Sequence, residues 1–445
     1  MKIPQRPPSH ERVQIAVAAL LARDSSVLDA RPEDRYLHWD DLRRRSPPDG
    51  LDHQTWWALL KLGRRLTRSA TPLVDGGGAS FGWSSTDRIT EHLHALDLWA
   101  GGHVGIAEPI VNREAQSQYY LSSLITEAIT SSQLEGASTT REVAEEMLLS
   151  KRKPRDAGER MIMNNYMTMQ RIHELKAEPL TPALVFELHR LVTADTLERP
   201  DAAGRLRRAD ERIAVVDNED QVLHTPPPAE SLPARLSALC DFANGKSPKG
   251  FLHPGLRAVI LHFWLAYDHP FVDGNGRTAR AIFYWSMLRA GYWLFEYVSI
   301  SEIILRAPVK YGRAFLLTET DDNDLTYFVL YHLGVIQESL DTLKRFIAKK
   351  ADEVRSLDGI LRLAADRFNH RQREFLSHAL RHPTEVYTIA GHQARQAIVY
   401  QTSRTDLLGL VDAGLLTRSE SGKKLVFRPV VDLEKRLRRL GDQAP

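Results

Sequence analysis

Cysteine is almost absent from this sequence of 445 residues, which has Cys240 alone. A single cysteine cannot form a disulfide within the chain, so the disulfide-stapled class of small secreted scaffolds is excluded. An isolated thiol is typical of proteins kept in a reducing compartment. We therefore expect a cytoplasmic protein that relies on a packed core.

Long hydrophobic runs are also missing. The longest strongly apolar stretch, Ala258 to Tyr267, is interrupted by His262, whereas a membrane-spanning helix needs ~20 mostly apolar residues. The first ten residues, Met1 to His10, are polar and rich in proline, unlike the apolar segment of a signal peptide. The sequence predicts no membrane partner.

Neither sign of charge is in excess, because the formal net charge is only +2. A balance so close to neutral does not indicate a nucleic-acid partner for the chain as a whole, so any such contact must be local. With 43% hydrophobic and 26% charged residues, the composition is that of an ordinary globular protein. The length exceeds what one hydrophobic core usually supports, which favours two or three domains.

Chemically useful residues are concentrated between His269 and Arg280, in the sequence HPFVDGNGRTAR. Gly274 and Gly276 allow a tight turn whose N–H groups point inward, and the helix expected from Thr278 to Leu288 begins just after it. Such a turn is a cradle for anions.

The charged residues of this stretch complete a nucleotide site. Arg277 and Arg280 are three residues apart, so they share one helix face and can grip successive phosphates. Asp273 suits Mg²⁺ held jointly by protein and phosphates. His269 is the one group in the stretch whose ordinary pKa allows it to take a proton near neutral pH.

Two other interpretations of the stretch are disfavoured. The glycine pattern from Gly274 to Ala279 resembles a dinucleotide fingerprint, but that fold needs a strand before it, and the preceding Val259, Phe263 and Tyr267 have helical spacing. A zinc site built from His253, His262 and His269 is disfavoured because spacings of nine and seven residues do not bring three imidazoles together on one helix face.

The stretch matches, at every defined position, the signature HPFx[DE]GNGRxxR and so resembles Fic-domain proteins. Upstream, Ser131 to Gly136, with the sequence SSQLEG, resembles the family's inhibitory motif [ST]xxxE[GN]. One departure is Asp268, where the family usually has an aliphatic residue. If that carboxylate faces His269, it favours the imidazolium and weakens the base.

The resemblance implies transfer of AMP from ATP to a hydroxyl side chain of a target protein, with Mg²⁺ as cofactor. His269 is then the base, Asp273 the metal ligand, and Glu135 an inhibitor that pairs with Arg280. The other implied positions are Gly274, Asn275 and Gly276 at the α-phosphate, Arg277 at the β-phosphate, Arg280 at the γ-phosphate, Tyr311 at adenine, and Ser131 and Gly136 in the inhibitory motif.

A β-hairpin is expected between helices, because Ile213 to Val216 and Gln221 to His224 flank a polar turn. The resemblance makes this hairpin the flap that binds an extended segment of the target by strand addition. The flap residues it implies are Ile213, Val215, Val216, Val222 and His224. A hairpin with no such role is the alternative.

The expected architecture is mainly α, with an N-terminal helical region at 1–111, a Fic catalytic domain at 112–350 and a winged-helix domain at 351–445. Local patterns predict helices at Val13 to Leu28 and Trp56 to Leu66, a flexible break at Gly76 to Gly78, and a capping box starting at Thr139.

The predicted winged helix leaves its partner open. Basic residues on its third helix and wing can meet DNA phosphates, but Asp406 and Asp412 lie on the same helix, so DNA and protein partners are equally favoured. The basic residues are Arg404, Lys423, Lys424 and Arg428. A DNA-binding regulator with a Fic sensor domain, and removal of AMP by the same site, are the alternative functions. The target, the modified residue and homo-oligomer formation stay open.

Overall fold

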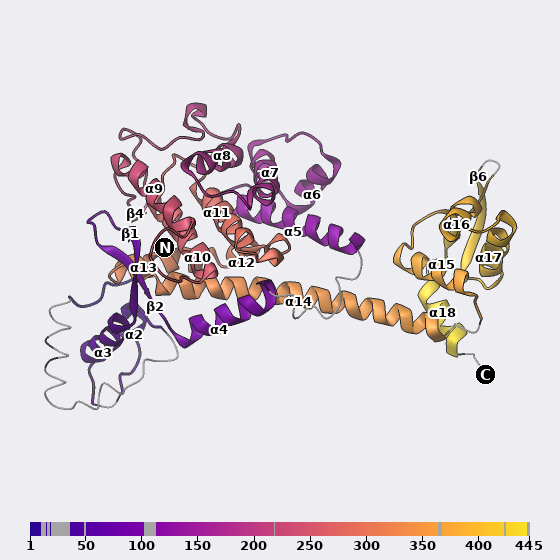
Figure 1. Ribbon diagram of the computed structural model, residues 1–445, viewed down its shortest axis with the longest axis horizontal. Coiled ribbons are helices and arrows are strands. Elements are labelled where there is room, and N and C mark those ends of the chain that lie inside the picture. Colours follow the sequence, from indigo (N-terminus) through magenta and orange to yellow (C-terminus); the bar gives the residue numbers. More distant parts are fainter. Residues whose placement is uncertain are drawn as a thin grey trace. The chain divides into compact units, whose positions relative to one another are not determined.

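A computed structural model describes residues 1–9, 15, 18, 36–48, 50–101, 113–217, 219–363, 367–421 and 424–442 (Figure 1). Within these ranges helices dominate and the named strands form only small antiparallel sheets, which confirms the mainly α class. The chain divides into two compact units, Met1–Leu343 and Lys344–Pro445. Among the described residues, no helix combines the length and apolarity needed to cross a membrane.

The first unit begins with a small aromatic core and a hairpin. Trp56 and Trp57 are buried in this core. The stretch Gly76 to Gly78 is a defined turn rather than a flexible break, because Asp75 Oδ1 accepts hydrogen bonds from the backbone of Gly77 and Ala79 at 2.9 Å each. The elements are α2 (Trp39–Leu42), α3 (His53–Leu66), β1 (Arg68–Val74), β2 (Ser80–Ser84), α4 (Asp87–Leu96) and a π-helical turn (Asp97–Gly101). The helix predicted at Val13 to Leu28 lies almost wholly outside the described residues.

Two helices form the centre of this unit. In α10 and α11 nearly every side chain is buried, because the pair pack on each other while α9 covers α10 and α5, α7 and α8 cover α11 (Figure 1). The bounds are α5 (Arg113–Gln133), α6 (Arg141–Ser150), α7 (Ala157–Leu175), α8 (Pro182–Thr193), α9 (Leu232–Ala243), α10 (Pro254–Asp268), α11 (Asn275–Arg289), α12 (Ile300–Arg306), α13 (Pro308–Thr320) and α14 (Thr326–Leu363). Short 3-10 turns lie at Pro200–Ala202, Ala229–Ser231 and Trp293–Glu296.

Two helix starts differ from the sequence prediction. The cap of α6 is Thr140, whose hydroxyl accepts from Val143 N, so the predicted box at Thr139 is one residue too early. The helix expected from Thr278 begins at Asn275 instead, because Gly274 takes a positive φ of 79° and turns the chain directly into the first helical residue. The motif arginines therefore lie inside the first two turns of α11.

The predicted hairpin is present but short. Its strands are β3 (Val215–Val216) and β4 (Val222–His224), paired antiparallel, and Ile213 lies before the first strand. Asp217 Oδ1 closes the turn by accepting from Glu219 N and Gln221 N at 3.0 Å each. The two strands form a sheet of their own, so each has an outer edge with no strand partner among the described residues.

The second unit is a small helical domain with a three-stranded sheet in the order β5-β7-β6. Its core contains Phe375, Leu407, Leu410 and Phe427. The elements are α15 (His370–Arg381), β5 (Tyr387–Thr388), α16 (Ile389–Gln396), α17 (Tyr400–Asp412), β6 (Leu416–Ser421), β7 (Lys424–Pro429) and α18 (Leu433–Asp442). Of the basic residues predicted to meet a partner, Lys423 lies outside the described residues.

Candidate active site

The polar stretch that begins at His269 forms a tight loop between the C-terminus of α10 and the N-terminus of α11. His269 ends α10 with φ 43° and ψ 56°, and Gly274 opens α11. A side chain at Gly274 would collide with the methyl group of Thr193, so the loop needs glycine there for both its φ and its space. The N-terminus of α11 is therefore directed at the loop.

Two side chains fix the loop from inside. Asn275 donates to Phe271 O and accepts from Phe271 N, both at 2.9 Å, so its amide holds the turn rather than facing a ligand. His189, from α8, stacks on Phe271 with ring centroids 3.7 Å apart and has Nε2 2.9 Å from Asp273 O. A lone histidine on a helix face gave no sequence signal for this supporting role.

His269 has the geometry of a base. Its Nδ1 lies 3.3 Å from Ala266 O, a carbonyl that can only accept, so the proton belongs on Nδ1. The other nitrogen, Nε2, makes no hydrogen bond with any described residue and is left as a lone pair. Burial lowers the pKa of His269 to about 4, so the imidazole is neutral at physiological pH.

The unusual carboxylate next to this base does not face it. Asp268 is buried and accepts from Arg235 Nε at 2.8 Å and from Trp264 Nε1 at 3.0 Å. Its charge is therefore matched by a guanidinium from α9. The case considered from the sequence, a carboxylate that faces His269 and weakens the base, therefore does not apply, because the side chain points into a buried ion pair.

Arg277 is a buried guanidinium with unused donors. Its side chain is fully buried, and Nη1 donates to Val192 O at 2.6 Å. Nε and Nη2 have no hydrogen-bond partner among the described residues, although Nη2 lies 3.6 Å from an Asp273 oxygen. Leaving such donors unpaired is costly, which is a sign that the site is built for an anionic ligand.

Arg280 has its donors occupied by α5. Nε donates to Ser131 Oγ at 2.8 Å, and Nη2 donates to Ser131 O at 2.9 Å and to Glu135 Oε1 at 2.8 Å. Burial alone would raise the pKa of Glu135, but the Arg280 charge and hydrogen bond outweigh it and leave that pKa below its ordinary value. The predicted pair thus exists as a charged contact.

Glu135 also covers the start of α11. A Cβ built on Gly276 would run into the Glu135 carboxylate, so this acidic group lies directly over the helix N-terminus, where an anion is favoured. Gly136, with φ 95°, turns the chain away immediately afterwards. One internal carboxylate therefore occupies the position that the loop and arginines offer to an anion.

Sequence reasoning missed the residue that anchors α5. Glu127, fully buried two turns before Glu135, accepts from Tyr284 at 2.8 Å, from Ser299 at 2.7 Å and from Ser301. Glu127, Ser131 and Glu135 are spaced by four, so one ridge of α5, continued into the turn that follows it, faces Tyr284, Arg280 and Gly276 on α11. The spacing is visible in the sequence, but the partners are not.

A cavity of about 220 Å³ joins the base to the inhibitory pair. Tyr311 lines it, and its hydroxyl lies 2.8 Å from Nε2 of His262, whose Nδ1 is 3.3 Å from Nε2 of His332. His262 is therefore a buried support for Tyr311 and no metal ligand. The predicted residues that line the cavity are Glu135, Val215, His224, His269, Gly276, Arg280 and Tyr311.

The remaining predicted residues lie beside this cavity or outside it. Asp273 is 54% exposed and accepts from Gly274 N at 2.5 Å. Val216 and Val222 are about half exposed on the flap. Among the described residues, no group of three or more His, Cys, Asp or Glu side chains could hold a metal ion.

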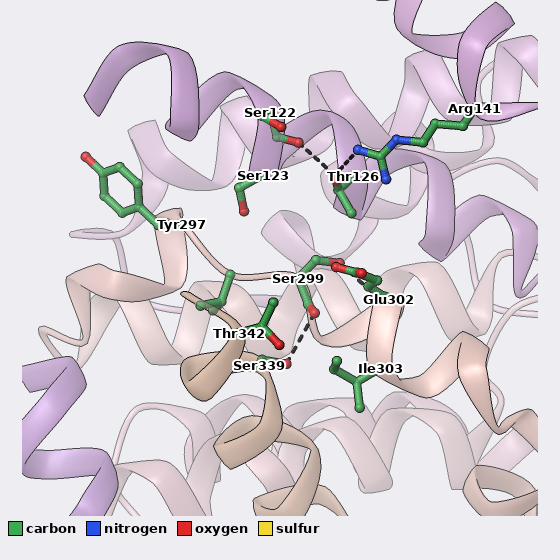
Figure 2. A pocket seen from close by; sticks show the side chains of 11 residues that line it. Ser122, Ser123, Thr126, Arg141, Tyr297, Ser299, Glu302, Ile303, Ser339 and Thr342 are labelled. Atoms are coloured by element: carbon green, nitrogen blue, oxygen red, sulfur yellow. Dashed lines mark hydrogen bonds between the residues drawn. The ribbon is translucent and has the colours of Figure 1, made fainter. Parts of the chain in front are cut away.

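A separate cavity of about 180 Å³ lies between α5, α12 and α14 (Figure 2). Hydroxyl groups dominate its lining, and Arg141 reaches it by donating to Thr126 Oγ1 at 3.0 Å. It has no lining residue in common with the cavity of His269. This cavity is polar and lies against α5, the helix whose Ser131 contacts Arg280.

Comparison with known proteins identifies the central part of the chain. Residues 179–287, from the loop before α8 to the end of α11, match the model of the Fic/DOC family. A curated protein adenylyltransferase Fic from Nematostella vectensis is 30% identical over 166 residues, which cover 37% of this chain and 34% of that protein. The match thus spans about a third of the relative's length.

Solved structures of low identity share the fold. A Fic family protein from Desulfovibrio desulfuricans G20 aligns with a TM-score of 0.55 and 18% identity, covering 79% of this chain and 98% of that one. Fic-1 from Caenorhabditis elegans aligns with a TM-score of 0.51 and 17% identity, covering 77% and 88%. The motif loop lies within residues 179–287, which are similar to the Fic/DOC family, and the helical fold around it is shared with solved Fic proteins.

Proposed function

We propose that this protein transfers AMP from ATP to the hydroxyl of a serine, threonine or tyrosine in a target protein. The observation that supports this most strongly is the pairing of a neutral base with unsatisfied cationic donors: His269 presents a free Nε2, and Arg277 holds two buried N–H groups without partners. A hydroxyl and a polyphosphate are the two substrates that such a site serves. The name of the Nematostella vectensis relative agrees with this chemistry.

The base acts on the incoming hydroxyl. His269 Nε2 takes the proton as the hydroxyl oxygen attacks the α-phosphorus of ATP. The new P–O bond forms while the bond from the α-phosphorus to the bridging β-phosphate oxygen breaks, and pyrophosphate leaves. General-base help of this kind contributes ~10²–10⁴-fold in rate.

The loop and α11 hold the phosphates. The backbone N–H groups from Gly274 to Gly276 lie at a helix N-terminus and suit the α-phosphate, while Asn275 keeps that backbone in place through Phe271. Arg277 is assigned to the β-phosphate and Arg280 to the γ-phosphate, in the two-pronged geometry that lysine lacks. Tyr311, in the cavity wall, is assigned to the adenine side.

Magnesium fits this site only together with ATP. Asp273 is a single exposed carboxylate at the mouth of the arginine pocket, and Mg²⁺ is commonly held by one or two carboxylates plus substrate phosphates. When bound, Mg²⁺ supplies charge neutralisation for the departing pyrophosphate. The part of Asp273 is to hold that ion at the phosphate side of the loop.

Glu135 is proposed to inhibit the resting protein. The γ-phosphate needs Arg280, but Ser131 and Glu135 now occupy its donors. Breaking an ion pair that is largely excluded from water costs ~3–5 kcal/mol, so the productive ATP pose should be populated 10²–10³-fold less often, as an order of magnitude. Release of α5 then controls the activity.

The flap is proposed to hold the target. Val215 lines the cavity, whereas Val216 and Val222 project outward. An extended segment added to an outer strand edge would bring its hydroxyl beside His269 by backbone hydrogen bonds.

Labelled ATP tests the proposal with three proteins. Glu135→Gly should label acceptor proteins far more strongly than the wild type, and His269→Ala should label none. Equal labelling by wild type and Glu135→Gly would remove the inhibitory assignment, and undiminished labelling by His269→Ala would remove the catalytic one. Loss of AMP from a pre-labelled acceptor in wild type alone would instead support AMP removal with Glu135 as a participant.

A second function, DNA binding by the second unit, gains support from Asp406. This carboxylate is buried and accepts from Arg371 at 2.7 and 3.0 Å and from Asn369 at 2.9 Å, so it does not face a ligand. The outward face of the first turns of α17 carries Gln401, Arg404 and Thr405, and the winged-helix interpretation would direct this helix at the major groove. A gel-shift titration at physiological salt, repeated with Arg404→Ala, would decide this.

A further inference from the structure

We propose that His224, as an imidazolium, is a positioning residue that clamps the flap to the C-terminus of α10 beside His269. The catalytic consequence of the clamp rests on the proposed function, whereas the clamp itself is a property of the fold. His224 was expected only as part of the strand that meets the target. Its side chain instead points inward and lines the cavity.

The two ring nitrogens have acceptors on different elements. Nε2 lies 2.7 Å from Tyr267 O, on the last turn of α10, and Nδ1 lies 2.7 Å from Glu319 Oε2, on the last turn of α13. A carbonyl can only accept, so Nε2 must carry a proton. A carboxylate also accepts, so the second nitrogen is protonated too and the ring is a cation with two donors.

The position of the ring favours this cation. Tyr267 O is one of the carbonyls that α10 leaves free at its C-terminus, where positive charge is stabilised by the helix dipole. The imidazole also packs on the Tyr267 ring, with centroids 4.6 Å apart. One side chain at the end of β4 therefore joins the flap to α10 and α13.

This clamp compensates for the weakness of the hairpin. The strands contain two and three residues, and an isolated two-stranded hairpin is marginally stable in water. Without the clamp, the short cross-strand pairing and the contact of the Met1 amine with Asp217 in the turn would have to hold the flap in place. We therefore expect the order of the flap to depend on His224 and Glu319.

The charges around the ring set its proton affinity. Burial alone would lower the pKa of His224, but the hydrogen bond and charge of Glu319 outweigh it and raise that pKa above 6.5. The clamp is thus present at lower pH and is lost as pH rises through the raised value. Other charged or titratable groups also lie near the ring. On the helices and beside them these are the ion pair of Asp268 with Arg235, Tyr267, His269, and Glu135 after α5. Around the flap they are Arg207, Asp75 after β1, and Asp217 with the Met1 amine.

The clamp also acts on the base. Burial is the main cause of the low pKa of His269, and the positive charge of His224 lowers it further. The same cation that orders the acceptor side therefore keeps the base free of a proton. One group serves both halves of the site.

Hydrogen–deuterium exchange of the full-length protein tests the clamp without any target or nucleotide. The flap peptide, residues 212–226, should exchange about tenfold faster in His224→Gln and in Glu319→Gln than in wild type at about pH 6, after correction for intrinsic rates. In wild type the protection should disappear with a midpoint equal to the His224 pKa measured by imidazole NMR, and that pKa should fall in Glu319→Gln. The double variant should exchange no faster than either single variant.

His173→Gln is the matched control, because His173 pairs with Glu296 on the surface at 2.9 Å. It should leave flap exchange unchanged, and exchange in the buried α11, which carries none of the substitutions, should be equal in all variants if they are folded. A His224 ring that is neutral at neutral pH, or flap protection that ignores pH and both substitutions, would overturn the proposal. Because nucleotide is not needed, failure of AMP transfer leaves these outcomes intact.

Discussion

The phosphate side and the acceptor side of the candidate site are built in different ways. On the phosphate side, α10, the motif loop and α11 are buried, and the loop is held by Asn275 and His189. On the acceptor side, a hairpin of five strand residues has half-exposed valines and depends on distant contacts. The motif loop is therefore held rigidly by buried contacts, whereas the hairpin, which we propose holds the target, is the part of the site that can move.

The largest effect should come from the base. In the Glu135→Gly background, His269→Ala should reduce AMP transfer by ~10²–10⁴-fold. Because the pKa of His269 is lowered to about 4, transfer should persist at mildly acidic pH and be lost as pH falls through about 4. Initial rates with labelled ATP across the acid range would measure both effects, with His173→Ala as a surface control. An acid limb near the ordinary histidine pKa would contradict the buried, neutral base.

Arg277 should show opposite effects on binding and stability. Arg277→Met removes a buried guanidinium with two unpaired donors, so the ligand-free protein should become more stable by about 1–3 kcal/mol. The same change should weaken ATP binding by about 100-fold, because the phosphate partner is gone. Denaturant unfolding and calorimetric titration in the Glu135→Gly background would measure the two.

Arg280→Met is the matched comparison, since that guanidinium is already paired with Ser131 and Glu135. It should destabilise the ligand-free protein, because Ser131 Oγ, Ser131 O and Glu135 Oε1 lose their donor. If both arginine variants change stability in the same direction, the phosphate side is not prepared for an anion in the way the orphan donors indicate.

The sequence predicted the phosphate side far better than the acceptor side, for a physical reason. His269, Asp273, Gly274, Arg277 and Arg280 lie within three turns' length of chain, so local spacing places them together. Even there, the sequence did not predict that the Asn275 amide would bond to the backbone of Phe271, because spacing alone does not give a side chain's partner inside a loop.

The long-range partners were mostly out of reach of sequence reasoning. The pairing of Glu135 with Arg280 was expected only from the family resemblance, and Glu127 was missed although it shares the spacing of Ser131 and Glu135 on α5. His224 was placed on the flap, but the direction of its ring was not predicted, because the contacts that hold it come from α10 and α13. Tertiary contacts decided each of these.

A smaller effect should come from the hold of α5 on the phosphate side. Ser131→Ala removes the hydroxyl that accepts from Arg280 Nε at 2.8 Å, which should raise the basal rate of transfer by about five- to tenfold, the equivalent of one typical hydrogen bond of about 1 kcal/mol. Ser132→Ala is a close control, because Ser132 Oγ donates only to Ala128 O of its own helix at 2.8 Å. Equal basal rates in the two variants would show that Glu135 alone restrains Arg280.

The smallest effect should be confined to the acceptor side. Val222→Thr on the exposed flap should leave stability within about 0.5 kcal/mol, because Val222 is 50% exposed and has little contact to lose. Labelling of proteins in a lysate by the Glu135→Gly form should nevertheless fall about two- to threefold, since strand addition uses the side chains beside the edge for specificity. Release of AMP to water from ATP, which needs no target, should stay constant. The control is Leu149→Thr on α6, where the side chain is 60% exposed, and this change should alter neither reaction. If Val222→Thr reduced both reactions in parallel, the flap would belong to the preorganised half of the site.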